Sequence, residues 1–192
     1  MLETILAVAL IVLFYGIYFG KALLQRKKGI RTNQMAKGNK APSLLRVEVL
    51  LKLASCGIVP VQLASIGLGW SLLPRPVRLL GAALALVGDL IFLASVITMK
   101  DSWRAGISES EKTALVQTGI YAVSRNPAFV GFDLMYLGLL LLFFNPLLCV
   151  FTLFAVVMLH LQILQEEKFL KRAFGQAYTQ YQAHVLRYLG RH

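Results

Sequence analysis

The long apolar runs constrain this chain most, because an uncharged stretch of about 20 residues can cross the hydrocarbon core of a bilayer. Residues 53–73 carry no charge, and residues 79–99 carry only Asp89. Three further apolar runs cover residues 4–19, 128–144 and 147–165. With 57% hydrophobic and only 15% charged residues, the composition excludes an ordinary soluble domain. We predict an all-α integral membrane bundle of five transmembrane helices and a cytosolic C-terminal helix, forming one domain over residues 1–192.

The first apolar run is short, and two interpretations compete for it. A cleavable signal peptide needs a basic start and a small-residue exit, whereas this chain begins Met-Leu-Glu and leaves the run as KALLQRKK. We therefore expect a retained helix, which spans the bilayer if Glu3 and Lys21 reach the two surfaces. No internal repeat is evident.

Lysine and arginine are distributed very unevenly among the polar segments. Eighteen of them lie in residues 20–52, 100–127 and 166–192, whereas Arg75 and Arg78 alone lie in the opposite set of connections. Because cytosolic loops carry the excess of Lys and Arg, this pattern predicts an external N-terminus and a cytosolic C-terminus. Chemistry with a water-soluble cosubstrate is then expected at the cytosolic boundary.

The net charge of +11 is explained by this orientation and by attraction to membrane lipids, so we expect no nucleic-acid partner. The two cysteines, Cys56 and Cys149, both fall inside apolar runs. Neither a disulfide framework nor a metal site is expected, because the chain has no CxxC and no paired histidines at metal-ligand spacing.

Polar and turn-forming residues flank the last two apolar runs. Residues 119–132 read GIYAVSRNPAFVGF, and the turn between the two runs reads FNPL. In that turn Asn145 is expected to cap the following helix, and Pro146 suits its first position. The last run leaves the membrane as QEEKFLKRAFGQAYTQYQAHVLR.

Together these motifs resemble the integral membrane methyltransferases typified by isoprenylcysteine carboxyl methyltransferase, with the phosphatidylethanolamine methyltransferases as relatives. The resemblance covers about the last 80 residues. SWRAGIS at residues 102–108 is similar to a segment of bacterial members, which favours a bacterial inner membrane. The matching residues are Gly119, Tyr121, Arg125, Pro127, Gly131, Glu166, Glu167, Leu170, Phe174, Gly175, Tyr178, Tyr181 and Arg187.

The resemblance implies S-adenosylmethionine as methyl donor, bound on the cytosolic side by the loop before the fourth span and by the last two spans. Carried over residue by residue, the implied donor-binding positions are Thr113, Ala114, Leu115, Val116, Tyr121, Asn126, Pro127, Ala128, Phe129 and Glu166. The implied catalytic residues are Arg125, Glu166 and Glu167. Typical members read Arg-His-Pro-x-Tyr where residues 125–129 here read Arg-Asn-Pro-Ala-Phe. Donor binding is expected to survive, because Asn can still hydrogen-bond and Phe can still stack.

A second departure concerns the acceptor. The position of the family's substrate-contacting arginine, four residues before the first Glu, is Gln162. An amide brings no charge to compensate a carboxylate in a low-dielectric site, so we expect a neutral lipophilic acceptor or a phospholipid amine that enters from the lipid.

Independently of the resemblance, the residue types present suit the chemistry of this donor. A sulfonium nucleoside with an amino-acid tail needs an anion, a cation, hydrogen-bond donors and an aromatic plane. Glu166 or Glu167 can take the ammonium or ribose hydroxyls, Arg125 or Arg104 can meet the carboxylate, and Tyr121 or Phe129 can cover the adenine. Pro127 keeps the preceding backbone extended, with groups free to bind.

Simpler roles compete with these. Glu167 can pair with Lys171 on a solvated helix face. Asp89 is either a functional group or a neutral acid bonded to a neighbouring helix. Asp133 and His160 are expected to form a polar contact between the last two spans. For Tyr178, Tyr181 and Arg187 we prefer docking of the C-terminal segment on lipid headgroups.

The sequence therefore predicts a membrane methyltransferase that uses S-adenosylmethionine and a lipophilic small-molecule or lipid acceptor. Two alternatives remain. One is a protein-S-isoprenylcysteine carboxyl O-methyltransferase proper, and the other is a non-enzymatic scaffold or transporter subunit. Binding of the donor would distinguish the enzymes from the scaffold.

Overall fold

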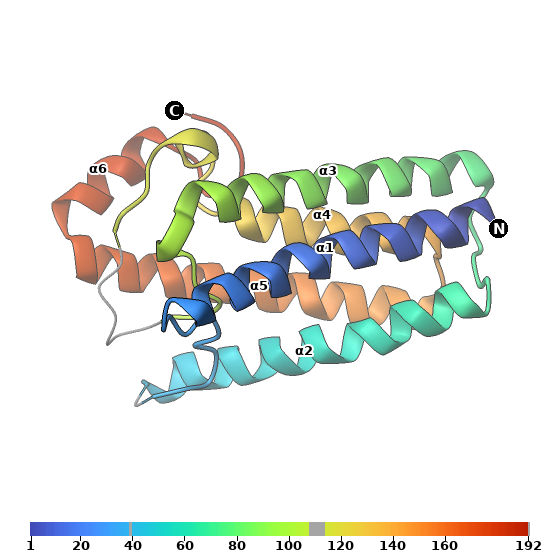
Figure 1. The fold of residues 1–192 in the computed structure, drawn as a ribbon, viewed down its shortest axis with the longest axis horizontal. Helices are drawn as coiled ribbons and strands as arrows, with labels where there is room; N and C mark the ends of the chain where they lie inside the picture. Colours follow the sequence, from blue (N-terminus) through green and yellow to red (C-terminus); the bar gives the residue numbers. More distant parts are fainter. Residues whose placement is uncertain (39, 108–113, 192) are drawn as a thin grey trace.

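The computed structural model describes residues 1–38, 40–107 and 114–191, and the regular secondary structure of these residues is helical. The predicted all-α class is confirmed for this part of the chain. The long helices lie side by side in an elongated bundle (Figure 1). In chain order the elements are α1 (Leu2–Lys27), α2 (Pro42–Gly67), α3 (Arg75–Met99), η1 (Lys100–Ser102), η2 (Gly119–Ala122), α4 (Pro127–Leu142), α5 (Pro146–Phe174) and α6 (Gln176–His184).

Four segments are long and apolar enough to cross a membrane: α1, α2, α3 together with η1, and α5. These correspond to four of the five predicted spans. The remaining predicted span, residues 128–144, is the helix α4, whose 16 residues fall short of the usual length of about 20. The protein is thus an integral membrane protein by its apolar helices, and a count of five spans stays a prediction.

Two helices differ in position from the apolar runs that predicted them. The run at residues 53–73 predicted a helix there, but α2 begins at Pro42 and ends at Gly67. Gly69 adopts a positive φ of 61°, and the Trp70 N–H bonds back to the Ser65 carbonyl at 3.0 Å, which ends the helix. At the other end of the chain, α5 continues past the predicted boundary at Gln165 to Phe174, so the separate C-terminal helix is only the short α6.

The predicted FNPL turn is confirmed. Asn145 caps α5 by accepting a hydrogen bond from the Leu148 N–H at 2.9 Å, and Pro146 is the first helical residue. The Asn145 amide also donates to the Ser65 hydroxyl at 2.9 Å. The cap therefore ties the start of α5 to the end of α2.

Glycines set the close packing of α3 against α4. A Cβ added to Gly88 would lie 2.7 Å from the Gly131 carbonyl oxygen, and one added to Gly81 would lie 2.6 Å from the Gly138 carbonyl oxygen. No side chain fits at either crossing, so the two backbones touch directly. This contact holds the start of α4 in place beside the end of α3.

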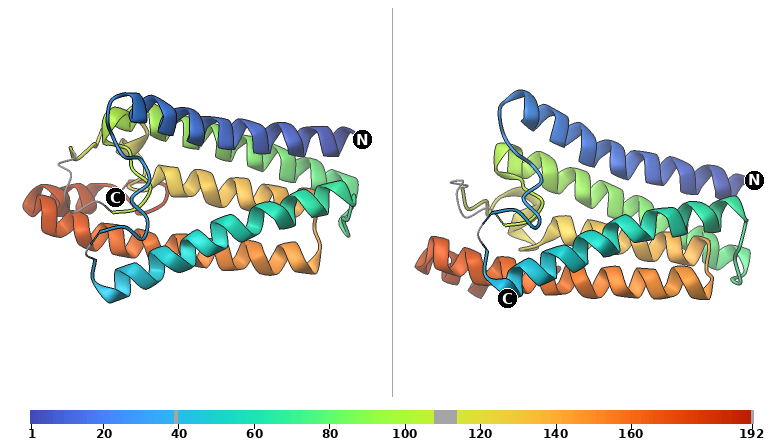
Figure 2. Two further views of the ribbon diagram at one scale, coloured as in Figure 1. Left: turned by 60° about the horizontal axis from the view of Figure 1, so that its bottom comes forward. Right: turned by 90° about the horizontal axis from the view of Figure 1, so that it is seen from below.

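The polar connections gather at one end of the bundle. The α1–α2 connection, the segment between α3 and α4, and α6 lie together there, whereas the N-terminus and the two tight turns lie at the opposite end (Figures 1 and 2). This arrangement brings residues from three distant parts of the sequence to the same end of the helices, where the cavities described next are found.

Candidate active site

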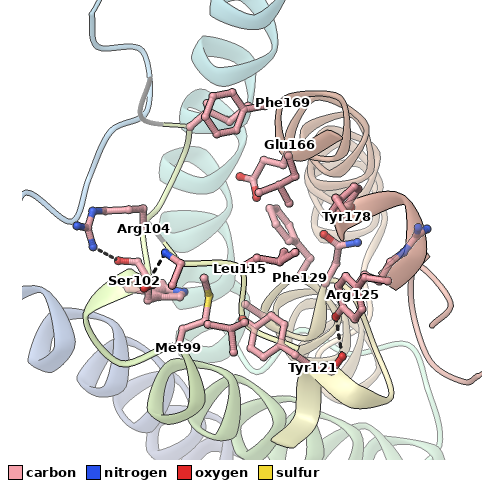
Figure 3. Close-up of a pocket in the computed structure, with 18 of the residues that line it drawn as sticks. Met99, Ser102, Arg104, Leu115, Tyr121, Arg125, Phe129, Glu166, Phe169 and Tyr178 are labelled. Carbon is pink, nitrogen blue, oxygen red and sulfur yellow. Dashed lines mark hydrogen bonds between the residues drawn. The ribbon is translucent and has the colours of Figure 1, made fainter. Parts of the chain in front are cut away.

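A cavity of about 130 Å³ lies at the polar end of the bundle, between η2, the start of α4, the end of α5 and α6. Figure 3 shows Phe129 and Leu115 near its middle, with Arg104 on one side and Tyr178 on the other. We call it the polar-end cavity. Its lining residues are Met99, Ser102, Trp103, Arg104, Gly106, Ile107, Ala114, Leu115, Val116, Tyr121, Arg125, Asn126, Ala128, Phe129, Glu166, Phe169, Leu170, Tyr178 and Tyr181.

Most of the implied donor-binding residues meet in this cavity. Eight of the ten line it, namely Ala114, Leu115, Val116, Tyr121, Asn126, Ala128, Phe129 and Glu166. Pro127 lies between two lining residues as the first residue of α4, and Thr113 falls outside the described residues. Sequence positions about 50 residues apart are thereby brought together.

Tyr121 occupies a tightly held position on the wall. Its carbonyl accepts a hydrogen bond from the Tyr181 hydroxyl at 2.6 Å, which fixes η2 against α6. Burial raises the pKa of the Tyr121 phenol, and the nearby Glu166 carboxylate raises it further. The phenol therefore stays protonated and presents a ring and a hydrogen-bond donor close to a carboxylate.

The expected role of the C-terminal tyrosines is wrong. Tyr178 and Tyr181 were expected to dock on lipid headgroups, but their exposed fractions are only 1% and 6%, and both line the polar-end cavity. The Tyr178 hydroxyl is buried and makes no hydrogen bond with any described residue. A buried hydroxyl that lacks a hydrogen-bond partner in a cavity wall is available to bind a ligand. The sequence signal was the Tyr-x-x-Tyr spacing, which puts both rings on one helix face.

Glu167 does not lie on a solvated face, and the predicted pairing with Lys171 is wrong. Its side chain is only 7% exposed, and Arg125 Nη2 lies 3.1 Å from one of its carboxylate oxygens. Arg187 donates to the other oxygen from Nε at 3.1 Å and from Nη2 at 2.9 Å. The Asn126 amide adds a bond of 3.1 Å. Glu167 is therefore the centre of a buried ion network behind the polar-end cavity.

Two arginines flank the cavity. Arg125 shares its Nη2 with Glu167, and its Nε and Nη1 are buried without a hydrogen-bond partner among the described residues. Arg104 donates to the carbonyls of Asp101 and Trp103 at 2.6 and 2.8 Å, which holds its guanidinium at the rim. Both positive charges thus lie in the wall of a cavity that Glu166 also lines.

A second, larger cavity of about 320 Å³ adjoins the first from inside the bundle. The two share Trp103, Arg104, Gly106, Ala128, Phe129 and Glu166. We call the second one the bundle cavity. Its other lining residues are Tyr15, Tyr18, Phe19, Asn33, Met35, Leu51, Lys52, Ser55, Cys56, Val59, Ala105, Phe132, Tyr136, Leu159 and Gln162.

Gln162, the predicted acceptor-binding residue, lines the bundle cavity, beside the residues that the two cavities share. Its amide nitrogen donates to Glu166 Oε1 at 3.1 Å, as expected for residues four apart on one helix face. This contact orients the amide so that its oxygen is left over, buried and without a partner in the described structure. The site thus offers a hydrogen-bond acceptor, and no positive charge, at the position where the family has its substrate-contacting arginine.

The polar residues inside the membrane do not pair as expected. His160 bonds to the Tyr188 hydroxyl through Nδ1 at 2.6 Å, so the expected contact between Asp133 and His160 is replaced by one to the C-terminal segment. Asp89 is fully buried, and neither of its oxygens bonds to a described residue. The structure favours neither a functional nor a structural bond for this carboxylate.

The sequence interpretation missed part of the site. Trp103, Gly106 and Ile107 lie in the SWRAGIS segment, which was noted only for its resemblance, yet they line the polar-end cavity. Trp103 is 4% exposed, and its carbonyl accepts a hydrogen bond from the Gln25 amide at 2.9 Å. A tryptophan beside an arginine at the end of an apolar run was the available signal.

The fold and the two adjoining cavities define a helical integral membrane protein with a polar site at one end that opens to an apolar site within the bundle. Comparison with known proteins gives the family. A sequence model of the family described as Phospholipid methyltransferase matches residues 77–177, more than half of the chain. The chain belongs to this family, and the resemblance seen in its motifs is confirmed.

Individual relatives agree with this assignment. The chain is 29% identical to protein-S-isoprenylcysteine O-methyltransferase B of Arabidopsis thaliana over 110 residues, which is 55% of each protein. It is 33% identical to the A form from the same plant over 106 residues, or 53% of each. It is 29% identical to protein-S-isoprenylcysteine O-methyltransferase of Saccharomyces cerevisiae over 119 residues, covering 60% of this chain and 50% of the yeast protein. The chain thus spans about half the length of these relatives.

Proposed function

We propose that this protein transfers a methyl group from S-adenosylmethionine to a lipophilic acceptor, with the donor in the polar-end cavity and the acceptor in the bundle cavity. The observation that carries the proposal is the junction of the two cavities. Both are lined by Phe129 and Glu166, and one lies among polar connections whereas the other lies among apolar helices. Family membership and the names of the relatives support methyl transfer.

The residues of the polar-end cavity suit this donor. Glu166 supplies the anion for its ammonium or ribose hydroxyls, and the rings of Tyr121 and Phe129 supply aromatic faces for its adenine. Arg104 and Arg125 supply positive charge for its carboxylate. The unpaired Tyr178 hydroxyl gives a further bond. At about 130 Å³ this cavity is smaller than usual ligand sites of about 300 Å³ or more, so the donor also extends into the adjoining space.

When bound, the donor supplies an electrophilic methyl group, and the protein's own residues hold and orient the acceptor. The Gln162 oxygen accepts a hydrogen bond from the S–H, N–H or O–H of a neutral acceptor. The Glu166 carboxylate, which the Gln162 amide contacts at 3.1 Å, takes the proton that methylation releases. Apolar walls exclude water and keep the approach fixed, which is the larger contribution to methyl transfer. Glu167 lines neither cavity and acts by holding Arg125, so we assign it as a positioning residue.

The proposed acceptor is a neutral lipophile rather than a prenylcysteine carboxylate. A carboxylate beside Gln162 would meet the lone pairs of the amide oxygen, and Glu166 would repel it. Lys52 and Arg104 also line the bundle cavity, so positive charge is present elsewhere in it. The immediate surroundings of Gln162 are what favour a neutral acceptor.

Equilibrium binding of radiolabelled S-adenosylmethionine to the detergent-solubilised protein tests the donor assignment. Glu166→Gln is expected to weaken binding by about 1–3 kcal/mol, the usual cost of losing a charged hydrogen-bond partner. Glu3→Gln is the matched control, because Glu3 pairs with Arg75 at the opposite end of the bundle. Wild-type protein that does not bind the donor would leave the scaffold as the better function, and equal affinity in both variants would remove Glu166 from the site.

Methyl transfer to a panel of acceptors tests the acceptor class. We expect poor transfer to a farnesylated cysteine analogue and better transfer to neutral lipophilic thiols, amines or hydroxyls. Gln162→Arg is expected to shift the preference toward the carboxylate, since a guanidinium compensates its charge. Efficient carboxyl methylation by the wild type, undisturbed in Gln162→Arg, would refute the argument from Gln162.

A further inference from the structure

Three hydroxyl groups from three different helices line the bundle cavity: Tyr15 on α1, Ser55 on α2 and Tyr136 on α4. The Tyr136 hydroxyl lies near those of Tyr15 and Ser55. Tyr136 is completely buried, and Tyr15 is partly buried. Neither phenol makes a hydrogen bond of good geometry with any described residue. We call these three residues the hydroxyl cluster.

Hydrocarbon side chains alone would give a more stable cavity wall at this place. An unsatisfied buried hydroxyl costs about 1–3 kcal/mol, and phenylalanine fills nearly the same space without that cost. The cavity does use hydrocarbon rings elsewhere, since Phe19 and Phe132 line it. Native proteins leave few buried polar groups without a partner, and each such group calls for an explanation. A ligand oxygen that completes the bonds of the cluster provides one.

The cluster lies deeper in the bundle than the junction of the cavities. Phe129, at the junction, and Tyr136 are seven residues apart on α4, which corresponds to about 10 Å along the helix axis. Ser55 lies one helical turn beyond Lys52 in α2, on the side away from the polar end. A molecule that reaches from the junction to the cluster therefore spans about 10 Å of apolar wall between two polar sites.

We propose that the hydroxyl cluster is a recognition subsite for a second polar group of the acceptor, a neutral oxygen such as a hydroxyl, ether or carbonyl, about 10 Å from the junction of the two cavities. The acceptor is then a lipophile with polar groups at two places, and a tail made only of hydrocarbon leaves the cluster unpaired. The description of this ligand as the methyl acceptor rests on the proposed function. The existence of the subsite does not, because ligand binding can be measured without methyl transfer.

Trp103 provides a direct readout of binding. It lines both cavities, and the only other tryptophan of the chain is Trp70, an exposed residue at the opposite end that Trp70→Phe removes. Two probes that carry a quenching aryl bromide are compared by titration of Trp103 fluorescence in detergent: 4-(4-bromophenyl)butan-1-ol and 1-bromo-4-butylbenzene. They differ only in the terminal hydroxyl, so the ratio of their affinities reports the oxygen subsite.

The test is the change of this ratio between proteins, which cancels the different partitioning of the probes into the micelle. Tyr15→Phe combined with Tyr136→Phe is expected to lower the preference for the alcohol at least about fivefold, the usual effect of losing a buried hydrogen bond. Affinity for the hydrocarbon probe is expected to stay unchanged, which shows that the cavity keeps its shape. Tyr18→Phe is the matched control, a tyrosine of the same cavity outside the cluster, and it is expected to leave the ratio as in the wild type.

A ratio that stays within about twofold of the wild type in the double variant would overturn the proposal. So would the absence of Trp103 quenching by either probe in the wild type, because the bundle cavity would then not admit a lipophile. Tyr15→Phe alone gives a second measurement, with a partial loss of preference expected. If the protein failed to bind S-adenosylmethionine but the double variant lost the preference, the subsite would stand and only its assignment to a methyl acceptor would fall.

Discussion

Replacing Glu167 by glutamine removes the negative charge that lies between the guanidinium groups of Arg125 and Arg187. The side chains of Glu167 and Arg125 are 7% and 6% exposed, so this pair is shielded from water. Arg125 already has two nitrogens without partners among the described residues, and the variant leaves its charge buried without compensation. Arg187 is 35% exposed, so water can hydrate its guanidinium when the Glu167 charge is removed.

The expected loss of stability is about 3 kcal/mol. Breaking a buried ion pair by removing one partner costs about 3–5 kcal/mol, and the lower end applies because the glutamine oxygen still accepts one bond and Arg187 reaches solvent. The free energy of unfolding is measured by SDS titration in mixed micelles. Glu166→Gln is the matched control on the next residue of α5. Glu166 accepts a hydrogen bond only from Gln162 among the described residues, so a change within about 0.5 kcal/mol is expected.

Arg187→Gln separates the two halves of the network. It leaves the Glu167–Arg125 pair in place and removes the two bonds of 2.9 and 3.1 Å, so a smaller loss of about 1–2 kcal/mol is expected. The combination of both substitutions is expected to cost less than the sum, since each removes part of the same contact. If Glu167→Gln were no more destabilising than Glu166→Gln, the assignment of Glu167 as the centre of a buried ion network would be refuted.

The packing of α3 against α4 predicts that Gly88→Ala destabilises the bundle by about 1–3 kcal/mol, because its Cβ would meet the Gly131 oxygen at 2.7 Å. Gly16→Ala is the control in α1, where nothing lies within 4 Å and no loss of stability is expected in the same SDS titration. The distribution of basic residues predicts that a reporter fused at His192 reads cytosolic and one inserted beside Asn145 reads external. The opposite readings would place both cavities at the external side and leave the proposed donor without access from the cytosol.

Local sequence patterns predicted those parts of the site that depend on one helix end. Asn126 and Pro127 begin α4 as expected, because proline suits the first helical position. The extended backbone with free groups expected before Pro127 is wrong, since the short helix η2 and a turn precede it and the Arg125 N–H already donates to the Leu186 carbonyl at 3.1 Å. Once the start of α4 is known, Phe129 lies in its first turn beside the residues before it. Gln162 and Glu166 share one face of α5 by their spacing, and the structure shows that they bond to each other. These placements need only helical periodicity.

Other parts depend on which way a helix faces, and periodicity alone does not give this. Glu167 and Lys171 are four apart, which suggested a solvated pair, but α5 turns Glu167 toward Arg125 instead. Arg187 reaches the same carboxylate from the C-terminal segment, 20 residues later. The end of α2 was misplaced for a related reason, since the apolar run continues past Gly67 into a connection that is not helical. Tertiary contacts decide both cases.

Glu48 shows why the walls of the two cavities are linked to a segment without any catalytic motif. It is completely buried, and it accepts hydrogen bonds from the Ala36 N–H at 2.7 Å, the Ile107 N–H at 3.1 Å and Lys40 Nζ at 2.6 Å. Its carboxylate therefore binds the α1–α2 connection to the segment that follows Trp103. The signal in the sequence was a single acidic residue among nine basic ones in residues 20–52. Because Ile107 lines the polar-end cavity, the basic segment from which the membrane orientation is predicted also holds one wall of the candidate active site.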